Sequence, residues 1–159
     1  GVEMWSLASG GIRNLAGEVT AARVKGLSTN MAVWWDGDLL RELLDGTQVS
    51  KYEWEADSCR VLARFDGCAR INGSKSNPCV HADILGDWRE EVLVRTQDNN
   101  ALRLYISTIP TNYRLHTFLH DPIYRISIAT QNVAYNQPTH TGFYIGSEVH
   151  GEFRGTYIP

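Results

Sequence analysis

The sequence lacks both a long hydrophobic run and an excess of charge of one sign. Its apolar stretches are short, such as residues 31–35, whereas a helix needs roughly 20 apolar residues to cross a bilayer. The 15 lysines and arginines are mixed with 18 aspartates and glutamates, for a formal net charge of -3, and no basic stripe is present for the phosphates of a nucleic acid. We therefore expect neither a membrane nor a nucleic acid as a partner.

Cysteine is scarce as well. Cys59, Cys68 and Cys79 form no C-x-x-C pair, and no histidine lies at zinc-finger spacing from them, which argues against a zinc site. Cys68 and Cys79 bracket a loop rich in glycine, asparagine, serine and proline, which a disulfide would restrain. Three separate thiols that act as small buried apolar side chains are the alternative, and the sequence leaves both open.

Signals for helices are nearly absent, because apolar residues alternate or form short blocks between glycine, asparagine, aspartate and proline. We therefore predict an all-β chain, with hairpins at turns that tolerate positive φ, such as 9–11 and 98–100. The expected strands are residues 3–8, 32–35, 42–44, 61–65, 91–95, 102–107, 125–129 and 142–145.

An internal repeat gives the strongest indication of architecture. Segments 37–44 and 86–93 share a Gly-Asp pair, a glutamate four residues after the aspartate and an apolar pair, at an offset of 86 minus 37, or 49 residues. That spacing is near the roughly 40 to 50 residues of one β-propeller blade, a four-stranded antiparallel sheet. Residues 3–5 match the end of a third copy without its Gly-Asp, so we expect the chain to begin inside a blade.

The second copy of the repeat has the layout of a short calcium loop that runs into a strand. Ca²⁺ takes six to eight oxygen ligands, and Asp83, Asp87 and Glu91 offer carboxylates while Arg89 offers a main-chain carbonyl. Leu85 stands where propeller calcium loops usually place another aspartate, so the expected cage lacks one carboxylate. A solvated acidic turn is the alternative.

The first copy of the repeat predicts a second, weaker calcium loop. Asp36, Asp38 and Glu42 supply its carboxylates, and Asp36 is the middle aspartate that the other copy lacks. Trp34 replaces the leading aspartate in this copy. The alternative of a solvated acidic turn applies here too.

Two polar segments are candidates for binding a carbohydrate. Asn72, Gly73, Ser74 and Lys75 group an amide, a hydroxyl and an ammonium in one loop, which suits sugar hydroxyls and a uronate carboxylate. Segment 131–138 crowds amide side chains around an aromatic ring, and such a ring packs on the C–H face of a sugar. A flexible polar loop and a capped strand are the alternatives.

Four segments together resemble the rhamnogalacturonan lyases of polysaccharide lyase family 11. They cover nearly the whole chain in matching order and comprise residues 33–44, 82–92, 119–122 and 131–138. The resemblance implies the C-terminal blades of an eight-bladed, calcium-rich propeller over residues 1–159. It further implies a secreted enzyme that cuts rhamnogalacturonan I, the pectic polysaccharide, by β-elimination between rhamnose and galacturonate. A bacterial source is favoured because residues 72–74 form an Asn-Gly-Ser glycosylation acceptor, and a glycan there would obstruct a cleft lined by this loop.

The resemblance also assigns roles to residues of the two polar segments. It places Asn72, Gly73 and Ser74 against substrate, with Ser74 in place of the family's threonine, and it makes Tyr135 an active-site residue with Asn136 beside it. Other cleft residues, including a catalytic arginine, would lie in the remaining blades of the same enzyme. β-Elimination needs a base for the C5 proton of galacturonate and a cation at its carboxylate. We expect Lys75 to be the base, with Tyr135 as the alternative.

Other classes of function stay open from the sequence. The segment could be a non-catalytic, calcium-stabilised part of a propeller that binds pectic sugar or a partner protein, or it could be purely structural, because one fold supports many functions. An assay for unsaturated uronate distinguishes the lyase from both.

Overall fold

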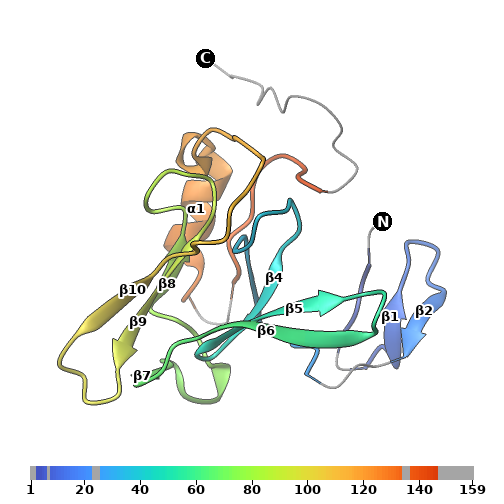
Figure 1. Cartoon of the computed structure of the whole chain (residues 1–159), viewed down its shortest axis with the longest axis horizontal. Coiled ribbons are helices and arrows are strands. Elements are labelled where there is room, and N and C mark those ends of the chain that lie inside the picture. Colours follow the sequence, from blue (N-terminus) through green and yellow to red (C-terminus); the bar gives the residue numbers. More distant parts are fainter. Residues whose placement is uncertain (1–2, 7, 23–25, 134–136, 147–159) are drawn as a thin grey trace.

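Two four-stranded antiparallel sheets form most of the chain in the computed structural model, which describes residues 3–6, 8–22, 26–133 and 137–146. In Figure 1 a separate hairpin lies at one end and the helix packs beside the second sheet. The hairpin consists of β1 (Gly11–Arg13) and β2 (Val19–Ala22). The first sheet has the order β3 (Met31–Val33), β4 (Glu42–Asp45), β5 (Gln48–Glu53) and β6 (Ser58–Arg64). In the second sheet, β9 (Glu91–Thr96) pairs with β10 (Leu102–Tyr105) along one edge and with β7 (Cys68–Ala69) and β8 (Val80–Ala82) along the other.

The predicted all-β class is confirmed apart from short helical segments. The described helices are the 3₁₀ turns η1 (Gly73–Lys75) and η2 (Phe118–His120) and the α-helix α1 (Pro122–Thr130). None of them is long and apolar enough to cross a membrane. Within the described residues the sheets do not close into a ring, so the propeller stays a prediction.

The sheet register confirms the internal repeat. Strand β3 pairs with β4 so that Met31 faces Leu44, and β8 pairs with β9 so that Val80 faces Leu93. Each partner in the second pair lies 49 residues after its counterpart in the first. Glu42 and Glu91 therefore occupy equivalent positions at the start of the second strand in each pair.

A common apolar core joins the two sheets. Strands β3, β4 and β5 contribute one side of it and β9 the other, because alternate residues of a strand point to the same face. The ring of Phe65 bridges them, with centroids 4.3 Å from Tyr105 and 6.1 Å from Trp35. Buried members of this core are Met31, Val33, Trp35, Leu44, Val49, Phe65, Cys68, Val92 and Val94.

The predicted strand at 125–129 is wrong, because this segment lies in helix α1. Asp121 caps the helix by accepting a hydrogen bond from the backbone N–H of Ile123 at 2.9 Å, and Pro122 occupies the first turn, where its missing N–H costs nothing. Tyr124 and Ser127 are buried on the inner face of the helix. The alternation of polar and apolar residues in 125–129 resembles a strand only when these start signals are ignored.

Two other predicted strands are also wrong. Among the described residues 3–6 and 8, Met4 alone forms an isolated bridge, to Arg13, and the Trp5 indole donates to the carbonyl of Ser28 at 2.9 Å. In 142–145, the Gly142 N–H bonds to the carboxylate of Asp121, which holds this segment against the start of α1. The predictions at 32–35, 42–44, 61–65, 91–95 and 102–107 coincide with β3, β4, β6, β9 and β10.

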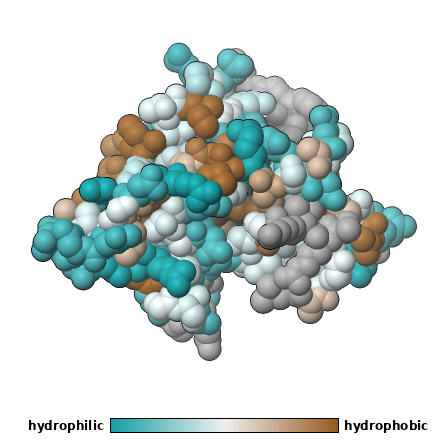
Figure 2. All heavy atoms as spheres, turned by 60° about the horizontal axis from the view of Figure 1, so that its bottom comes forward, coloured by the Kyte–Doolittle hydropathy of each residue, from teal (hydrophilic) through white to brown (hydrophobic). Residues whose placement is uncertain are grey.

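The structure contains no bridge between Cys68 and Cys79, and the three thiols are separate. Cys68 is buried in the core, where its Sγ lies 3.5 Å from the hydroxyl of Tyr105. The alternative of small apolar thiols therefore holds for Cys68. Over the face drawn in Figure 2, apolar side chains form separate patches among hydrophilic ones.

Candidate active site and acidic loops

The loop that carries Lys75 is the 3₁₀ turn η1, which is flanked on both sides by residues with positive φ. Asn72, Gly73 and Ser76 have φ of 59°, 54° and 57°, a region that asparagine and glycine tolerate better than most residues. This backbone leaves residues 72–74 exposed and Lys75 half-buried. The structure thus brings the predicted substrate-binding side chains of this loop together on one protruding turn.

The neck of this loop is fixed to the first sheet and to itself. Asn77 and Ile71 pair through both backbone hydrogen bonds, at 2.9 and 3.2 Å. The carbonyl of Ser76 accepts from the backbone N–H of Gly46, in the turn between β4 and β5, at 3.1 Å. The loop is therefore held at its base while its tip faces solvent.

An open hollow lies beside the loop and contains two arginines that the sequence patterns do not single out. Arg95 comes from β9, where its guanidinium donates to the Asn99 side chain at 2.7 Å and to the Arg70 carbonyl at 3.1 Å. Guanidinium groups suit carboxylate ligands. No motif marks them, because the pairing of β7 with β9 brings them together across 25 residues of sequence. The hollow is lined by Ala69, Arg70, Ile71, Asn72, Gly73, Arg95 and Asn99.

The second polar segment begins against the base of the Lys75 loop. Asn132 accepts a hydrogen bond from the side chain of Asn77 at 2.8 Å and donates one to the carbonyl of Cys79 at 2.8 Å. Its neighbour Gln131 accepts from the backbone N–H of His81 at 2.9 Å and donates to its carbonyl at 3.1 Å. The two predicted segments are thus brought together, while Tyr135 and Asn136 lie outside the described residues.

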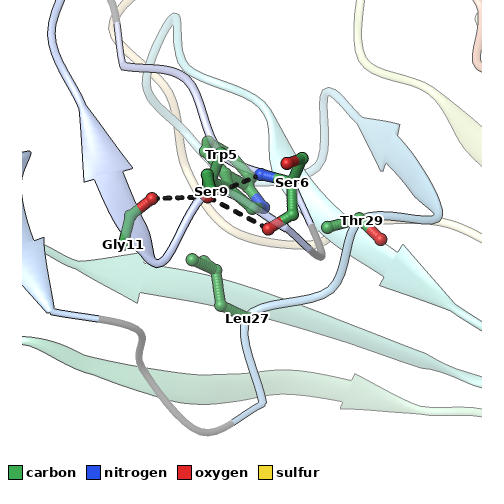
Figure 3. Close-up of a pocket in the computed structure, with 6 residues that line it drawn as sticks. All are labelled: Trp5, Ser6, Ser9, Gly11, Leu27 and Thr29. Carbon is green, nitrogen blue, oxygen red and sulfur yellow. Dashed lines mark hydrogen bonds between the residues drawn. The ribbon is translucent and has the colours of Figure 1, made fainter. Parts of the chain in front are cut away.

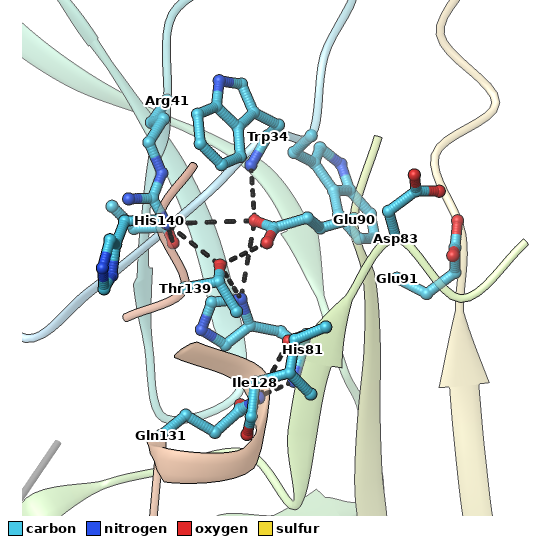
Figure 4. A network of polar contacts seen from close by, with 12 residues as sticks. Trp34, Arg41, His81, Asp83, Glu90, Glu91, Ile128, Gln131, Thr139 and His140 are labelled. Carbon is cyan, nitrogen blue, oxygen red and sulfur yellow. Dashed lines mark hydrogen bonds and ion pairs between the residues drawn. The ribbon is translucent and has the colours of Figure 1, made fainter. Parts of the chain in front are cut away.

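A buried polar network joins the two repeats beneath these segments (Figure 4). Its centre is Glu90, whose carboxylate accepts from Tyr124 at 2.7 Å and from the backbone N–H of Trp34 at 3.0 Å. His81 Nδ1 lies 3.5 Å from the same carboxylate, and Thr139 also donates to it. Glu90 and His81 are fully buried. Sequence patterns marked Glu90 only as part of the repeat, so its role in the core was missed.

The charges of this network explain its protonation state. Burial by itself raises the pKa of Glu90, but the charge and hydrogen bond of His81, the charge of Arg41 and the bond from Thr139 outweigh it and lower the pKa to about 2. Burial and the charge of Glu90 raise the pKa of Tyr124, which therefore stays a hydroxyl donor. The Arg41 guanidinium also stacks on Trp34, with its Cζ 4.3 Å from the ring centroid.

The first acidic loop gathers its carboxylates around a lysine. Asp36, Asp38 and Glu42 are the group of acidic side chains, within the described part of the chain, whose oxygens all lie within 4.8 Å of one another. Lys51 reaches from β5 into this group, with Nζ 2.6 Å from Asp38, 3.2 Å from Glu42 and in contact with Asp36. The donor atoms suit calcium, but an ammonium lies among them.

The second acidic loop differs from the first in backbone conformation, with φ of 80° at Gly86 and 74° at Trp88, and in its side-chain partners. Asp83 accepts from the Thr117 hydroxyl at 2.7 Å and the Phe118 N–H at 2.8 Å, while Asp87 pairs with the Arg89 guanidinium at 2.8 Å. Glu91 accepts from two loop N–H groups at 2.8 Å each. Three expected calcium ligands are therefore near one another without forming a closed cage.

One observation in this second loop fits a cation. Asp83 is fully buried, and its Oδ1 has no hydrogen-bond partner among the described residues. Burial raises the pKa of Asp83, and burial together with the charges of Asp87 and Asp83 raises the pKa of Glu91, although bonds from backbone N–H groups partly oppose both shifts. A divalent cation would supply the counter-charge that these groups lack.

A small cavity near the N-terminal hairpin is not a substrate site. Figure 3 shows the Ser9 hydroxyl in its lining, where it donates hydrogen bonds to the carbonyls of Ser6 and Gly11. Its volume of about 10 Å³ is near the space of a single water molecule. A sugar ring does not fit there.

Comparison with known proteins identifies the chain's relatives. Residues 1–154 match the family model of "Rhamnogalacturonan lyase family 11, C-terminal domain". The chain is 48% identical over 146 residues to rhamnogalacturonan endolyase YesW of Bacillus subtilis, and 48% identical over 128 residues to rhamnogalacturonan exolyase YesX of the same organism. These alignments cover 92% and 76% of the chain, respectively.

Solved structures agree with the sequence relatives. The crystal structure of rhamnogalacturonan lyase YesW superimposes with a TM-score of 0.85 at 45% identity, over 94% of this chain and 25% of that one. The Bacillus licheniformis rhamnogalacturonan lyase PL11 gives a TM-score of 0.83 at 44% identity, over 92% of this chain and 24% of that one. The chain spans 23% and 21% of the length of YesW and YesX. It belongs to rhamnogalacturonan lyase family 11, within the C-terminal domain of that family.

Proposed function

We propose that the chain forms one part of the substrate cleft of a lyase that cleaves rhamnogalacturonan I between rhamnose and galacturonate. The observation that carries this proposal is the 48% identity to an endolyase and to an exolyase for rhamnogalacturonan. The rest of the cleft would come from the remainder of the complete protein. Because the polymer is a plant cell-wall component and the relatives are from Bacillus, we also propose that the complete protein is a secreted bacterial enzyme.

Lys75 is the proposed base in this reaction. A neutral amine at Nζ would remove the C5 proton of galacturonate, and the electrons of that C–H bond would form a C4–C5 double bond. The bond from C4 to the leaving oxygen would break with its electron pair on that oxygen, which would take a proton from solvent and leave as a hydroxyl. The proposal is supported by the position of Lys75 on an exposed turn whose two ends are held by backbone hydrogen bonds. Asn72, Gly73 and Ser74 would bind sugar hydroxyls beside it, with Tyr135 and Asn136 completing the site.

The second candidate function is non-catalytic binding of a pectic uronate. The hollow beside the loop contains Arg70 and Arg95, and two guanidinium groups would hold a carboxylate whether or not a base is near. In that case Lys75 would contribute only to affinity. Replacement of Lys75 would therefore lower kcat if the chain acts as part of a lyase, and would change only KM if Lys75 contributes to binding alone.

The test is Lys75→Ala in the complete protein, followed by the ultraviolet absorbance of unsaturated uronate on rhamnogalacturonan. Loss of a base costs roughly 10² to 10⁴ in kcat, and the fold should be unaffected because Lys75 lies outside the core. Arg114→Ala, which removes an exposed cation elsewhere, is the matched control. A rise in KM at unchanged kcat would support the binding function instead, and wild-type kinetics would contradict both.

We further propose that calcium binds the second acidic loop through Asp83, Asp87, Glu91 and the Arg89 carbonyl. The unpartnered buried oxygen of Asp83 supports this assignment. Asp87→Ala should lower the calcium affinity by at least about tenfold, since it removes one of few charged ligands, and should lower the calcium-dependent Tm. Titration calorimetry measures the affinity, with Asp66→Ala as the control for loss of an exposed carboxylate. A folded protein that takes up no calcium would remove this proposal.

A further inference from the structure

Lys51 sits in the first acidic loop as a metal ion would. Its Nζ contacts one oxygen from each of Asp36, Asp38 and Glu42. An ammonium has three N–H donors, so the three carboxylates match its full donor set. Glu42 is fully buried, and the side chains of Lys51 and Asp36 are 19% and 13% exposed.

The electrostatics of the loop depend on this lysine. Three carboxylates whose oxygens lie within 4.8 Å repel one another, and the repulsion grows as water is removed. The ammonium of Lys51 offsets that repulsion, because its Nζ lies 2.6 Å from Asp38, 3.2 Å from Glu42 and in contact with Asp36.

The second repeat shows what the same loop looks like without the lysine. Strand pairing places Ser50 opposite Leu43 and Tyr105 opposite Val92, so that the next residues, Lys51 and Ile106, are equivalent by register. The second repeat therefore has the uncharged side chain of Ile106, which is 49% exposed, at the position that Lys51 occupies in the first repeat.

The two loops otherwise share their backbone hydrogen bonds. Glu42 accepts from the N–H groups of Trp35 and Asp36, and Glu91 accepts from Ile84 and Leu85, the residues 49 positions later. The glutamate therefore closes the loop in both repeats. The loops differ in the lysine, in the carboxylate of Asp36, which is replaced by Leu85 in the second repeat, and in backbone conformation, since Gly86 and Trp88 have φ of 80° and 74°.

We propose that Lys51 is the built-in cation of the first acidic loop, and that this loop therefore closes without a metal ion. This replaces the calcium site expected at Asp36, Asp38 and Glu42. It also means that removal of the ammonium uncovers a latent site for a divalent cation of the calcium type, because three carboxylates remain on a closed backbone.

The test compares Lys51→Met with the wild type in the complete protein, by calcium titration calorimetry and by Tm with EDTA or calcium. Methionine keeps the length of the side chain and removes its charge. We expect Lys51→Met to bind one additional equivalent of calcium, to melt at a lower temperature in EDTA and to recover when calcium is added. Lys51→Arg, which keeps the charge, should bind no additional ion.

A second variant tests the wild-type loop directly. Asp38→Asn should leave the calcium stoichiometry of the wild type unchanged and should remove the additional equivalent from the Lys51→Met background. A wild-type protein that loses one equivalent on Asp38→Asn would overturn the proposal, because the loop would then already hold a metal ion. A folded Lys51→Met protein with no gain of calcium would overturn the latent site. Neither readout depends on lyase activity.

Discussion

At the scale of single residues, Glu90 links several separate segments of the chain. Its carboxylate meets Trp34 and Arg41 from the first repeat, His81 from β8, Tyr124 from α1, and Thr139. Its own backbone N–H donates to the Trp34 carbonyl at 2.7 Å. A buried charge is tolerated only when it is paired and hydrogen-bonded, and here the partners come from four places in the chain. The side chain thus helps fix how the two repeats sit together.

A loss of stability in acid follows from the lowered pKa of Glu90. Its folded-state pKa of about 2 lies below its ordinary value of 4.5, so its contribution is present above pH 4.5 and is lost as the pH falls toward 2. At 1.36 kcal/mol per pKa unit the loss is on the order of 3 kcal/mol. Urea unfolding from pH 5 to pH 2 measures it. The Glu90→Gln variant should be less stable than the wild type at pH 7, and its free energy of unfolding should change less between pH 5 and pH 2. If the free energy of unfolding changes equally with pH in both proteins, the assignment to Glu90 is contradicted.

The carboxylates of the first acidic loop could be predicted from the sequence, but the lysine among them could not. The repeat placed Asp36, Asp38 and Glu42 together correctly, because they lie within seven residues of one another. Lys51 enters from the adjacent strand β5, and its position depends on the pairing of β4 with β5. A motif that ends at the loop contains no signal for it, so the expectation of a metal ion was formed without the lysine that reaches into the loop.

Among the elements, α1 matters because it ends at the polar segment of the candidate site. Tyr124 anchors its first turn to Glu90 and to the backbone of Asp83. Gln131, just after its last turn, forms two hydrogen bonds with the backbone of His81 in β8, and so acts as a short extension of the sheet. The helix was mistaken for a strand, while the carbohydrate-binding role expected of the polar segment that follows it stays a prediction.

Asn132 should position the two polar segments relative to each other. It joins Asn77, two residues after Lys75, to the segment that leads toward Tyr135. Asn132→Ala removes two hydrogen bonds, which should lower stability by about 1–3 kcal/mol. On the proposed function, small displacements of the cleft groups should also lower kcat/KM by about tenfold to a hundredfold. Rhamnogalacturonan kinetics measure this, with Asn100→Ala in the exposed turn as the control, and unchanged kinetics in a destabilised protein would leave Asn132 a purely structural role.

At the scale of the whole molecule, the sequence predicted the repeated antiparallel sheets better than their number of strands. The offset of 49 residues was visible because loop carboxylates and strand residues recur together, and the register reproduces it. Strand β5 was missed, since Gln48, Ser50 and Lys51 make it look polar although Val49 is fully buried. The relation between repeats depends on contacts such as Trp34 with Glu90, across 56 residues, which no local pattern reveals.

Strand β10 presents an apolar edge that the described residues do not cover. Leu102 and Leu104 in β10 and Ile106 just after it alternate with other residues and are 61%, 42% and 49% exposed, respectively. The intervening Tyr105 packs on Phe65 in the core, so the exposed side chains lie on the opposite face. An apolar stripe on an edge strand promotes pairing with other chains, and in the complete protein we expect a neighbouring segment to cover it.

The isolated 159 residues should therefore self-associate and show no lyase turnover, because both the cover for β10 and the rest of the proposed cleft are missing. Leu104→Lys should shift the isolated chain toward monomer in light scattering, since a charge at an edge opposes pairing. The same change in the complete protein should lower its Tm, because it buries a charge under the covering segment. Thr108→Lys, at an exposed position beyond the strand, is the matched control and should do neither. If the isolated wild-type chain is monomeric, or if Leu104→Lys leaves the Tm of the complete protein unchanged, then no segment covers β10. If the isolated chain produces unsaturated uronate, then its own residues suffice for the reaction.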